Sequence, residues 1–235
     1  MAVSFLGGSA DTSNRKVLTL LVLSPHPDDL ELSCGLLCHK AILMGWRVCE
    51  IVLTDGAAGG NEPKIYHTEQ LRQLRIEEAK SGARILGIEQ IEFLGVEDSK
   101  LHLDLKFLSS VLLKKLESLS PEVIVFPSAR DTHSDHSSTH LSATSALSRY
   151  HKTTHSLQYC FWGNDPQQNI VLSHVVGIKV KEGAIKKHKT QPIDRYFRRL
   201  YESDGVTNGN ERYYSPDSNK TVSVMLDWGF NVQQI

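Results

Sequence analysis

Short apolar segments alternate along this chain with stretches of helical character, and this alternation restricts the fold more than any other feature. Residues 17–24 are almost continuously apolar, as in a strand that is buried on both faces. Comparable segments at 47–54, 90–94 and 123–126 are each followed, directly or after a loop, by apolar residues at helical spacing. The pattern predicts an α/β fold: a doubly wound, mostly parallel, Rossmann-like sheet with helices on both faces.

The domain organisation follows from the chain length and from where the alternation weakens. A length of 235 residues fits one domain. We expect residues 1–16, which are rich in Gly and Ser, to be a flexible lead-in and residues 17–235 to form a single domain. After Tyr150 the alternation weakens, and the remaining expected elements are strands at 171–180 and 221–226 and two short helices, broken at Pro192, within 182–199.

The bulk composition excludes several classes of partner. The net charge of −1 gives no reason to expect binding to nucleic acid or to an acidic membrane surface. No apolar run approaches the roughly 18 residues that span a bilayer, and the start of the chain lacks the pattern of a signal peptide, so we expect no membrane anchor and a cytoplasmic location. None of the four cysteines forms a Cys-x-x-Cys pair, which argues against a thiolate zinc knuckle or a redox motif.

A first cluster of polar residues follows the apolar segment 17–24. His26, Asp28 and Asp29 lie within four residues of one another, and in open α/β sheets ligands bind where the chain leaves the carboxyl end of a strand. Two adjacent carboxylates and an imidazole would repel and desolvate one another unless a cation were present. Taken alone, the segment is equally compatible with a simpler interpretation, in which Asp28 or Asp29 caps the following helix.

A second cluster follows the apolar segment 123–126, at His133, Asp135 and His136. One histidine could bind a metal while the other transfers a proton, and Asp135 could orient an imidazole. Alone, this pair could also be two solvated loop histidines. A doubly wound sheet would bring both clusters to one edge, which predicts two histidines and a carboxylate around one ion, an arrangement typical of catalytic zinc. His140, one helical turn further on, is more readily a supporting or surface histidine than a ligand.

At these two clusters the sequence resembles the PIG-L/LmbE-like family of zinc-dependent de-N-acetylases. The first family hallmark is His-Pro-Asp-Asp-x-Glu with a glycine a few residues later, and the second is His-x-Asp-His after a later strand. The matching segments here are His26–Glu31 with Gly35, His133–His136, Thr54–Gly56, Arg75–Glu78, Phe93–Asp98 and, more faintly, His188–Gln191. The likeness extends from about Val17 to Tyr150.

The resemblance implies the roles of the site residues. It implies one zinc ion (Zn2+) per chain, held by His26, Asp29 and His136. It implies Asp28 as the general base and His133 as general acid or oxyanion partner, oriented by Asp135. It implies that Arg75 and Asp98 contact the substrate, although Arg75 could instead form an intrahelical ion pair with Glu78. Some relatives carry a tyrosine where this chain has Asp131.

The implied function is zinc-dependent hydrolysis of the N-acetyl group of an N-acetylglucosamine-type amino sugar or sugar conjugate, with release of acetate. The partner is then a small-molecule amino sugar, and the resemblance also allows a homo-oligomer, since relatives often assemble in that way. The alternatives are a metal-dependent amidohydrolase or phosphoesterase acting on a non-sugar substrate, and a non-catalytic sugar-binding relative. Trp162 and Tyr159 could stack on a sugar ring, although aromatic residues in such a segment are more often part of the core.

Overall fold

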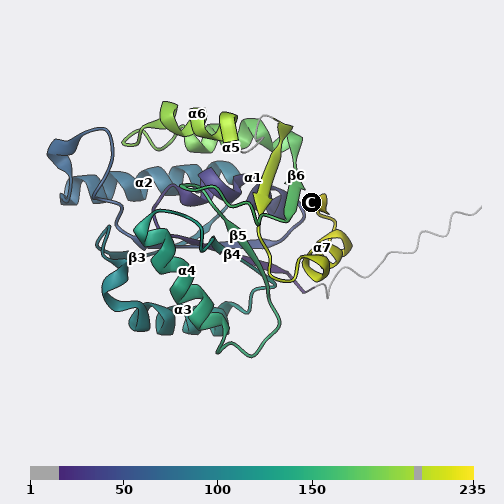
Figure 1. The fold of residues 1–235 in the computed structure, drawn as a ribbon. Helices are drawn as coiled ribbons and strands as arrows, with labels where there is room; N and C mark the ends of the chain where they lie inside the picture. Colours follow the sequence, from purple (N-terminus) through teal and green to yellow (C-terminus); the bar gives the residue numbers. More distant parts are fainter. Residues whose placement is uncertain (1–15, 204–207) are drawn as a thin grey trace, which may run out of the picture.

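The computed structural model describes residues 16–203 and 208–235, and its centre is a five-stranded parallel sheet in the order β3-β2-β1-β4-β5. Figure 1 shows this sheet with helices above and below it. The strands are β1 (Thr19–Ser24), β2 (Arg47–Thr54), β3 (Gln90–Val96), β4 (Val123–Pro127) and β5 (His155–Tyr159). The connecting helices are α1 (Asp29–Leu43), α2 (Glu69–Leu86), α3 (Leu105–Leu119) and α4 (Ser134–Leu147). The predicted doubly wound α/β fold is therefore confirmed.

Apolar residues on both faces of the central strands explain why these segments form a buried sheet. Every residue of β1 is buried, and successive side chains of a strand point to opposite faces. Leu20 and Val22 pack into a core with α1 and α2, whereas Leu21 and Leu23 pack into a second core with α3 and α4. The continuous apolar character of β1 thus reflects a strand covered by helices on both sides.

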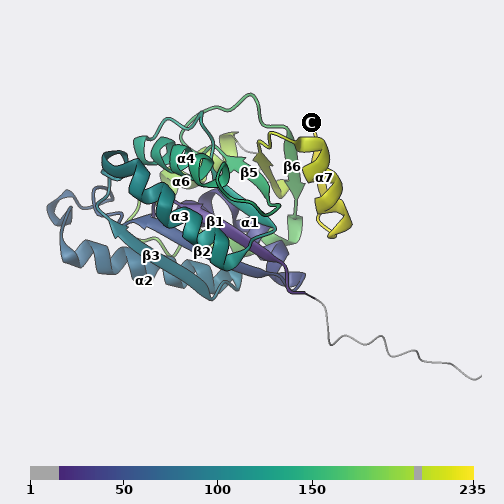
Figure 2. The ribbon, with the colours of Figure 1, turned by 90° about the horizontal axis from the view of Figure 1, so that it is seen from below.

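The order of the strands reverses at β1, and this reversal positions the site. From β1 the chain moves outward through β2 to β3, and it then returns to place β4 and β5 on the other side of β1. As a result α1 and α2 cover one face of the sheet, and α3 and α4 cover the other (Figures 1 and 2). β1 and β4 are direct neighbours, so the residues that follow them meet at the switch point where such sheets bind ligands.

The C-terminal part of the chain differs from the sequence prediction. Its elements are β6 (Ile170–Ser173), α5 (Ile178–Ile185), α6 (Ile193–Ser203), β7 (Asn210–Tyr213), α7 (Ser218–Asp227) and β8 (Val232–Gln234), with β6, β7 and β8 forming a small antiparallel sheet. The 3₁₀ turns are Pro63–Ile65, Leu101–Asp104 and Val175–Gly177. The prediction of a helix break at Pro192 is confirmed, because α6 begins directly after it.

Of the two strands predicted in this region, one is confirmed only at its start and the other is wrong. The expected strand at 171–180 ends at Ser173, and the chain then turns and forms α5. The expected strand at 221–226 lies within α7, where Thr221 and Met225, one helical turn apart, are the buried residues. Short apolar segments suit either structure by spacing alone, and tertiary packing decides between them.

Residues 1–15 of the expected lead-in lie outside the described residues. Among the described residues, no helix has both the length and the apolar character needed to cross a bilayer.

A buried carboxylate from β7 stabilises a kink in α1. Helical geometry is interrupted at Cys34, whose φ is −140°, and a restarted helix presents N–H groups without intrahelical partners. The N–H groups of Leu36 and Leu37 donate to the two carboxylate oxygens of Glu211, at 2.8 and 2.9 Å. Lys181 Nζ also donates to Glu211, at 2.6 Å, and the Lys181 side chain is 1% exposed. This carboxylate therefore joins α1, α5 and β7.

We expect Glu211→Gln to destabilise the protein by about 3–5 kcal/mol, because it leaves the ammonium group of Lys181 buried without a counter-charge. Chemical denaturation of the variant measures this loss of unfolding free energy. Glu117→Gln, on the exposed face of α3, is the matched control and should change stability little. The double variant Glu211→Gln/Lys181→Met should recover part of the loss, and a cost below about 1 kcal/mol for the single variant would contradict the ion-pair account.

Candidate active site

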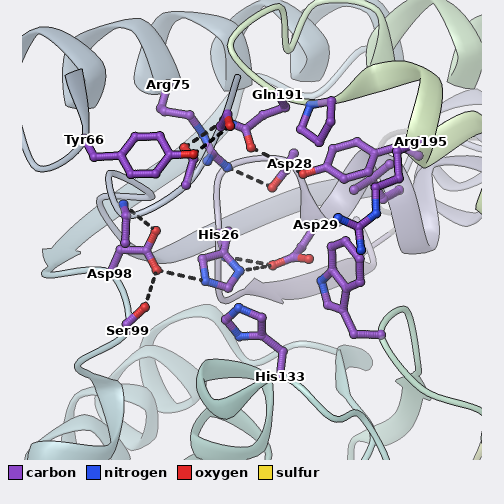
Figure 3. Close-up of a pocket in the computed structure, with 17 residues that line it drawn as sticks. His26, Asp28, Asp29, Tyr66, Arg75, Asp98, Ser99, His133, Gln191 and Arg195 are labelled. Carbon is purple, nitrogen blue, oxygen red and sulfur yellow. Dashed lines mark hydrogen bonds and ion pairs between the residues drawn. The ribbon is translucent and has the colours of Figure 1, made fainter. Parts of the chain in front are cut away.

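A cavity of about 310 Å³ opens at the carboxyl edge of the sheet, beside the ends of β1 and β4. Six residues predicted from the sequence line it, as Figure 3 shows: His26, Asp28, Asp29, Arg75, Asp98 and His133. His136 and Asp135 are fully buried and contact the lining residues from behind. The fold thus brings together all the residues for which a role was predicted, from segments more than 100 positions apart.

The first hallmark does not serve as a helix cap. Asp28 occupies the N-cap position of α1 but makes no side-chain capping hydrogen bond. Asp29 accepts a hydrogen bond from the backbone N–H of His26, at 2.7 Å, and this bond holds the loop between β1 and α1. The Asp28 carboxylate points into the cavity instead, which argues against the capping interpretation and leaves Asp28 free for chemistry.

The Asp29 carboxylate lies between two imidazole rings. Its Oδ2 is 3.2 Å from Nδ1 of His26, and its Oδ1 is 3.2 Å from Nε2 of His136. Both ring nitrogens of His136 are buried, and neither makes a well-formed hydrogen bond to any of the described residues. A buried nitrogen aimed at a carboxylate without a well-formed hydrogen bond suits a cation placed between them. These residues therefore fit a divalent metal chemically.

The remaining nitrogens of the two histidines contact carboxylates. Nε2 of His26 lies 3.3 Å from Asp135 and 3.4 Å from Asp98, and Nδ1 of His136 lies 3.0 Å from Asp131. Metal-binding histidines usually donate their second N–H to a carboxylate or carbonyl, which sets the tautomer and aims the free nitrogen. The contacts therefore aim Nδ1 of His26 and Nε2 of His136 at Asp29.

Two groups of potential ligands with closely spaced donor atoms share His26, and neither contains Asp29. Donor atoms lie within 4.8 Å of one another in the group His26, His133 and His136 and in the group His26, Asp98 and Asp135. In the second group, both carboxylates already accept backbone hydrogen bonds, from Ala58, Ser99 and Leu101.

In the first group, His133 takes the place of Asp29. Asp29 contacts both of the other histidines and supplies negative charge for a cation, whereas His133 faces the cavity. The set His26, Asp29 and His136 therefore stays our predicted ligand set.

Carboxylates shift the protonation of the buried histidines. Burial disfavours the charged form of His136, but Asp29 and Asp131 outweigh it and raise the pKa of His136 to about 9. Burial likewise opposes the charged form of His26, and its contacts with Asp135, Asp29 and Asp98 raise its pKa well above 6.5. Conversely, and despite burial, His136 and His26 hold the pKa of Asp29 well below its usual range. Without a metal, His26 and His136 are therefore protonated near pH 7.

We expect the affinity for zinc to rise by about tenfold or more per pH unit up to pH 9, because the ion must displace the proton of His136 and, at lower pH, that of His26 as well. The stability of the metal-free protein should change in the opposite direction. A raised folded-state pKa contributes stability that is complete below pH 6.5 and is lost as the pH rises through about 9. Competition with a coloured chelator and thermal melts of the metal-free protein measure the two trends, and a pH-independent affinity would contradict this prediction.

Asp131 contacts a predicted metal ligand, and sequence reasoning gave it no role in the site. Its carboxylate contacts His136 at 3.0 Å and accepts backbone N–H groups of His133, Phe161 and Trp162, at 3.1, 2.9 and 3.1 Å. One buried side chain thus holds a ligand ring, the start of α4 and a wall of the cavity. The one sequence signal for Asp131 was its position two residues before His133. At that position the sequence showed only that some relatives carry a tyrosine instead.

We expect Asp131→Asn to weaken zinc affinity by roughly 10- to 100-fold, because the amide replaces the charged acceptor that orients the His136 ring. Metal competition titrations measure this effect directly. Asp227→Asn, at an exposed position at the end of α7, is the control and should leave the affinity unchanged. Equal zinc affinities for Asp131→Asn and the wild type would show that His136 needs no such partner.

Arg75 binds the predicted base. Its guanidinium donates to Asp28 Oδ1 and to the carbonyl of Gly56, both at 2.9 Å, and it is buried. Gly56 has a φ of +62°, and a Cβ there would lie 2.6 Å from the ring of Pro27, so glycine permits this approach. Glu78 instead accepts two hydrogen bonds from Thr190. The alternative of an intrahelical Arg75–Glu78 pair is therefore not observed.

Asp135 and His133 are arranged differently from the prediction. The Asp135 carboxylate contacts His26 and accepts the N–H groups of Ser99 and Leu101, at 2.7 and 3.3 Å. Its link to His133 runs through the backbone, since Nδ1 of His133 accepts the N–H of Asp135 at 3.3 Å. Burial, then repulsion from the positive charges of His26 and His136, lowers the pKa of His133 below 6.5. Asp135 therefore supports His26, and His133 is neutral near pH 7.

The C-terminal part of the chain supplies a wall of the cavity that sequence reasoning did not find. Trp162, Gln191, Arg195 and Tyr196 line this side. The Tyr196 hydroxyl lies 3.3 Å from Oε1 of Gln191, and burial, followed by the nearby Asp28 carboxylate, raises the pKa of Tyr196 well above 10. Trp162 and the segment around Gln191 carried a sequence signal, whereas Arg195 and Tyr196 carried none. Tyr159 is 2% exposed in the main core, so of the two aromatic candidates only Trp162 reaches the cavity.

Comparisons with known proteins agree with this geometry. The model of the PIG-L family, described as GlcNAc-PI de-N-acetylase, matches residues 21–147, which is more than half of the chain and includes both hallmarks. A diacetylchitobiose deacetylase from Thermococcus kodakarensis is 24% identical over 192 residues, which cover 74% of this chain and 70% of that protein.

Solved structures that share the fold include one that is named for a hydratase and not for a deacetylase. The conserved protein TT1542 from Thermus thermophilus superposes with a TM-score of 0.70 at 25% identity, covering 85% of this chain and 95% of the other. The 4-carboxy-2-hydroxymuconate hydratase GalB from Pseudomonas putida KT2440 also reaches a TM-score of 0.70, at 18% identity, covering 85% and 96%. The fold alone therefore does not decide the reaction, which depends on the side chains of the site.

Proposed function

This chain belongs to the PIG-L family of de-N-acetylases, and from that premise we propose that it is a zinc-dependent hydrolase that removes the N-acetyl group of an N-acetylglucosamine-type amino sugar or sugar conjugate and releases acetate. One observation carries the proposal. Asp28, a carboxylate outside the predicted ligand set, faces the same cavity as Asp29 and His26, with His136 directly behind. A spare base beside a metal site is what amide hydrolysis requires.

The metal would be held by His26, Asp29 and His136, with Asp131 and Asp135 fixing the two rings. When bound, zinc polarises a carbonyl group and lowers the pKa of water to about 7. The protein contributes the orientation of its ligands and their charge balance. Zinc is our choice among divalent ions because two imidazoles and one carboxylate are ligands typical of catalytic zinc sites.

Asp28 would act as the general base. Its Oδ1 is held by Arg75, and this ion pair orients the carboxylate toward the cavity, so that it accepts a proton from the attacking water. Arg75 is itself anchored to the carbonyl of Gly56, so the pair is rigid. A base held in this way avoids the cost of reorienting during the reaction.

His133 would act as the oxyanion partner. Nδ1 of His133 accepts the backbone N–H of Asp135, which leaves the proton of the neutral ring on Nε2. Its lowered pKa keeps the ring neutral in the resting protein. The Nε2–H group would donate a hydrogen bond to the negative charge that develops on the acetamide oxygen. Asp28 would then pass the proton that it took from the water to the leaving amine, so that acetate and the free amine depart.

A substrate panel tests the proposal. Zinc-loaded protein is assayed for released acetate with N-acetylglucosamine, its conjugates and a non-sugar acetamide, and for released phosphate with a phosphate ester. We expect release of acetate from the sugars only, loss of activity with a chelator and recovery with zinc. Preferential cleavage of the phosphate ester, or of the non-sugar amide, would establish a rival hydrolase. Binding of sugars without turnover would identify a non-catalytic module.

A further inference from the structure

Positive charge gathers at the mouth of the cavity. Arg195 lines the cavity, and Figure 3 shows its side chain reaching in from α6, on the side away from Asp98. A wider hollow of about 580 Å³ adjoins the cavity and shares Gln191, Pro192 and Arg195 with it. Lys189 and Arg198 also line this hollow. The mouth of the site therefore continues into a basic surface.

The inner charges of the cavity do not account for Arg195. Asp28 is paired with Arg75, while Asp29 and Asp98 contact His26. Among the described residues, neither Arg195 nor Arg198 nor Lys189 makes an ion pair with a carboxylate. Asp194 is the one acidic residue that lines the adjoining hollow. The excess of positive charge is thus local to the rim.

The Arg195 guanidinium is also held in place. It lies over the ring of Trp162, 5.6 Å from the centroid, and stacking on an aromatic face orders an arginine while leaving its N–H groups available. An arginine presented in this way suits the paired oxygens of a phosphate or carboxylate. A neutral sugar would leave the three cations without partners.

We propose that Arg195, with Lys189 and Arg198 beside it, binds an anionic group of the substrate, so that the enzyme acts on N-acetylated amino sugars that carry a phosphate or carboxylate. The inference rests on the proposed deacetylase function. It separates this chain from a relative that is named for diacetylchitobiose, a neutral disaccharide. Arg195 lies outside residues 21–147, which the family model matches, so the preference belongs to the C-terminal part of this chain.

Acetate release from four soluble substrates by the zinc-loaded protein tests this inference. N-acetylglucosamine and diacetylchitobiose are neutral, N-acetylglucosamine 1-phosphate carries a phosphate, and N-acetylmuramic acid carries a carboxylate. We expect kcat/KM to be about tenfold or more higher for an anionic substrate, since a hydrogen bond to a charged group contributes that much. Raising the salt concentration from 0.05 to about 0.5 M should reduce this advantage. The same phosphate linked to a long-chain alcohol, in micelles, distinguishes a lipid headgroup from a soluble sugar phosphate.

Arg195→Gln should bring the ratio of anionic to neutral kcat/KM close to one. Arg84→Gln, an exposed arginine on α2 outside the site, should keep the wild-type ratio. Calorimetry with glucosamine 1-phosphate and glucosamine gives a readout without turnover, and the phosphate should add affinity only when Arg195 is present.

The outcomes separate this inference from the proposed function. Equal kcat/KM for neutral and anionic sugars would overturn the inference and leave the deacetylase function standing. A preference that persists in the double variant Arg195→Gln/Arg198→Gln would also overturn it. Release of acetate from none of the sugars would instead refute the proposed function, and the inference would fail with it.

Discussion

Asp28→Asn is expected to lower kcat by at least about 10²-fold while the protein still binds one zinc ion, because proton transfer by a positioned base contributes roughly 10²–10⁴-fold. The substitution keeps the size of the side chain and removes its ability to accept the proton. Steady-state kinetics on protein whose zinc content has been measured provide the check. Thermal melts are needed alongside, since the variant also weakens the pair with buried Arg75.

Chemical rescue sharpens this experiment. Asp28→Ala should regain part of its rate when formate, a small carboxylate, is added, whereas a variant that is merely unfolded should not. A rate for zinc-loaded Asp28→Asn within tenfold of the wild type would show that another group is the base. The comparison therefore distinguishes loss of chemistry from loss of structure.

His136→Ala should abolish activity by a different route, through loss of the metal. Removing a direct ligand should weaken zinc binding by more than about 10²-fold, beyond the effect of losing a partner that only orients a ligand. Elemental analysis after dialysis should find about one zinc per wild-type chain and almost none in the variant. His26→Ala should behave in the same way.

His140→Ala is the matched control for this loss. His140 lies one turn after His136 on α4, and its Nδ1 contacts the carbonyl of Pro127 at 3.0 Å. The control variant should retain zinc and activity. Normal zinc loading of both His136→Ala and His26→Ala would refute the ligand assignment. Normal loading of His136→Ala alone, with zinc lost from His26→Ala, would favour the group of His26, Asp98 and Asp135.

Much of the site could be predicted because its parts are short and local in the chain. The apolar segments that became β1 and β4 are buried on both faces, and a strand of that kind has little freedom to be anything else. The first hallmark follows β1 directly, and the second follows β4 after a short loop. Once the sheet was predicted to be doubly wound, their meeting followed from the geometry of such sheets.

Asp131 and Asp135 show what local pattern cannot reveal. Both are carboxylates near the second hallmark, and the sequence assigned the orienting role to Asp135 alone. The structure turns Asp135 toward His26 and Asp131 toward His136. The direction of each side chain depends on backbone N–H groups donated from distant loops, at Ser99 for one and Trp162 for the other. No spacing within residues 131–136 contains that information.

The residues of the chain alone thus determined the sheet, the two hallmarks and the edge at which they meet, because burial and strand order are set by apolar patterns that can be read along the chain. The tertiary structure alone decided which carboxylate supports which histidine, that the segment 221–226 is helical, and that α6 brings Arg195 and Tyr196 to the cavity. These features arise from contacts between segments far apart in sequence, whose free energies no local window includes.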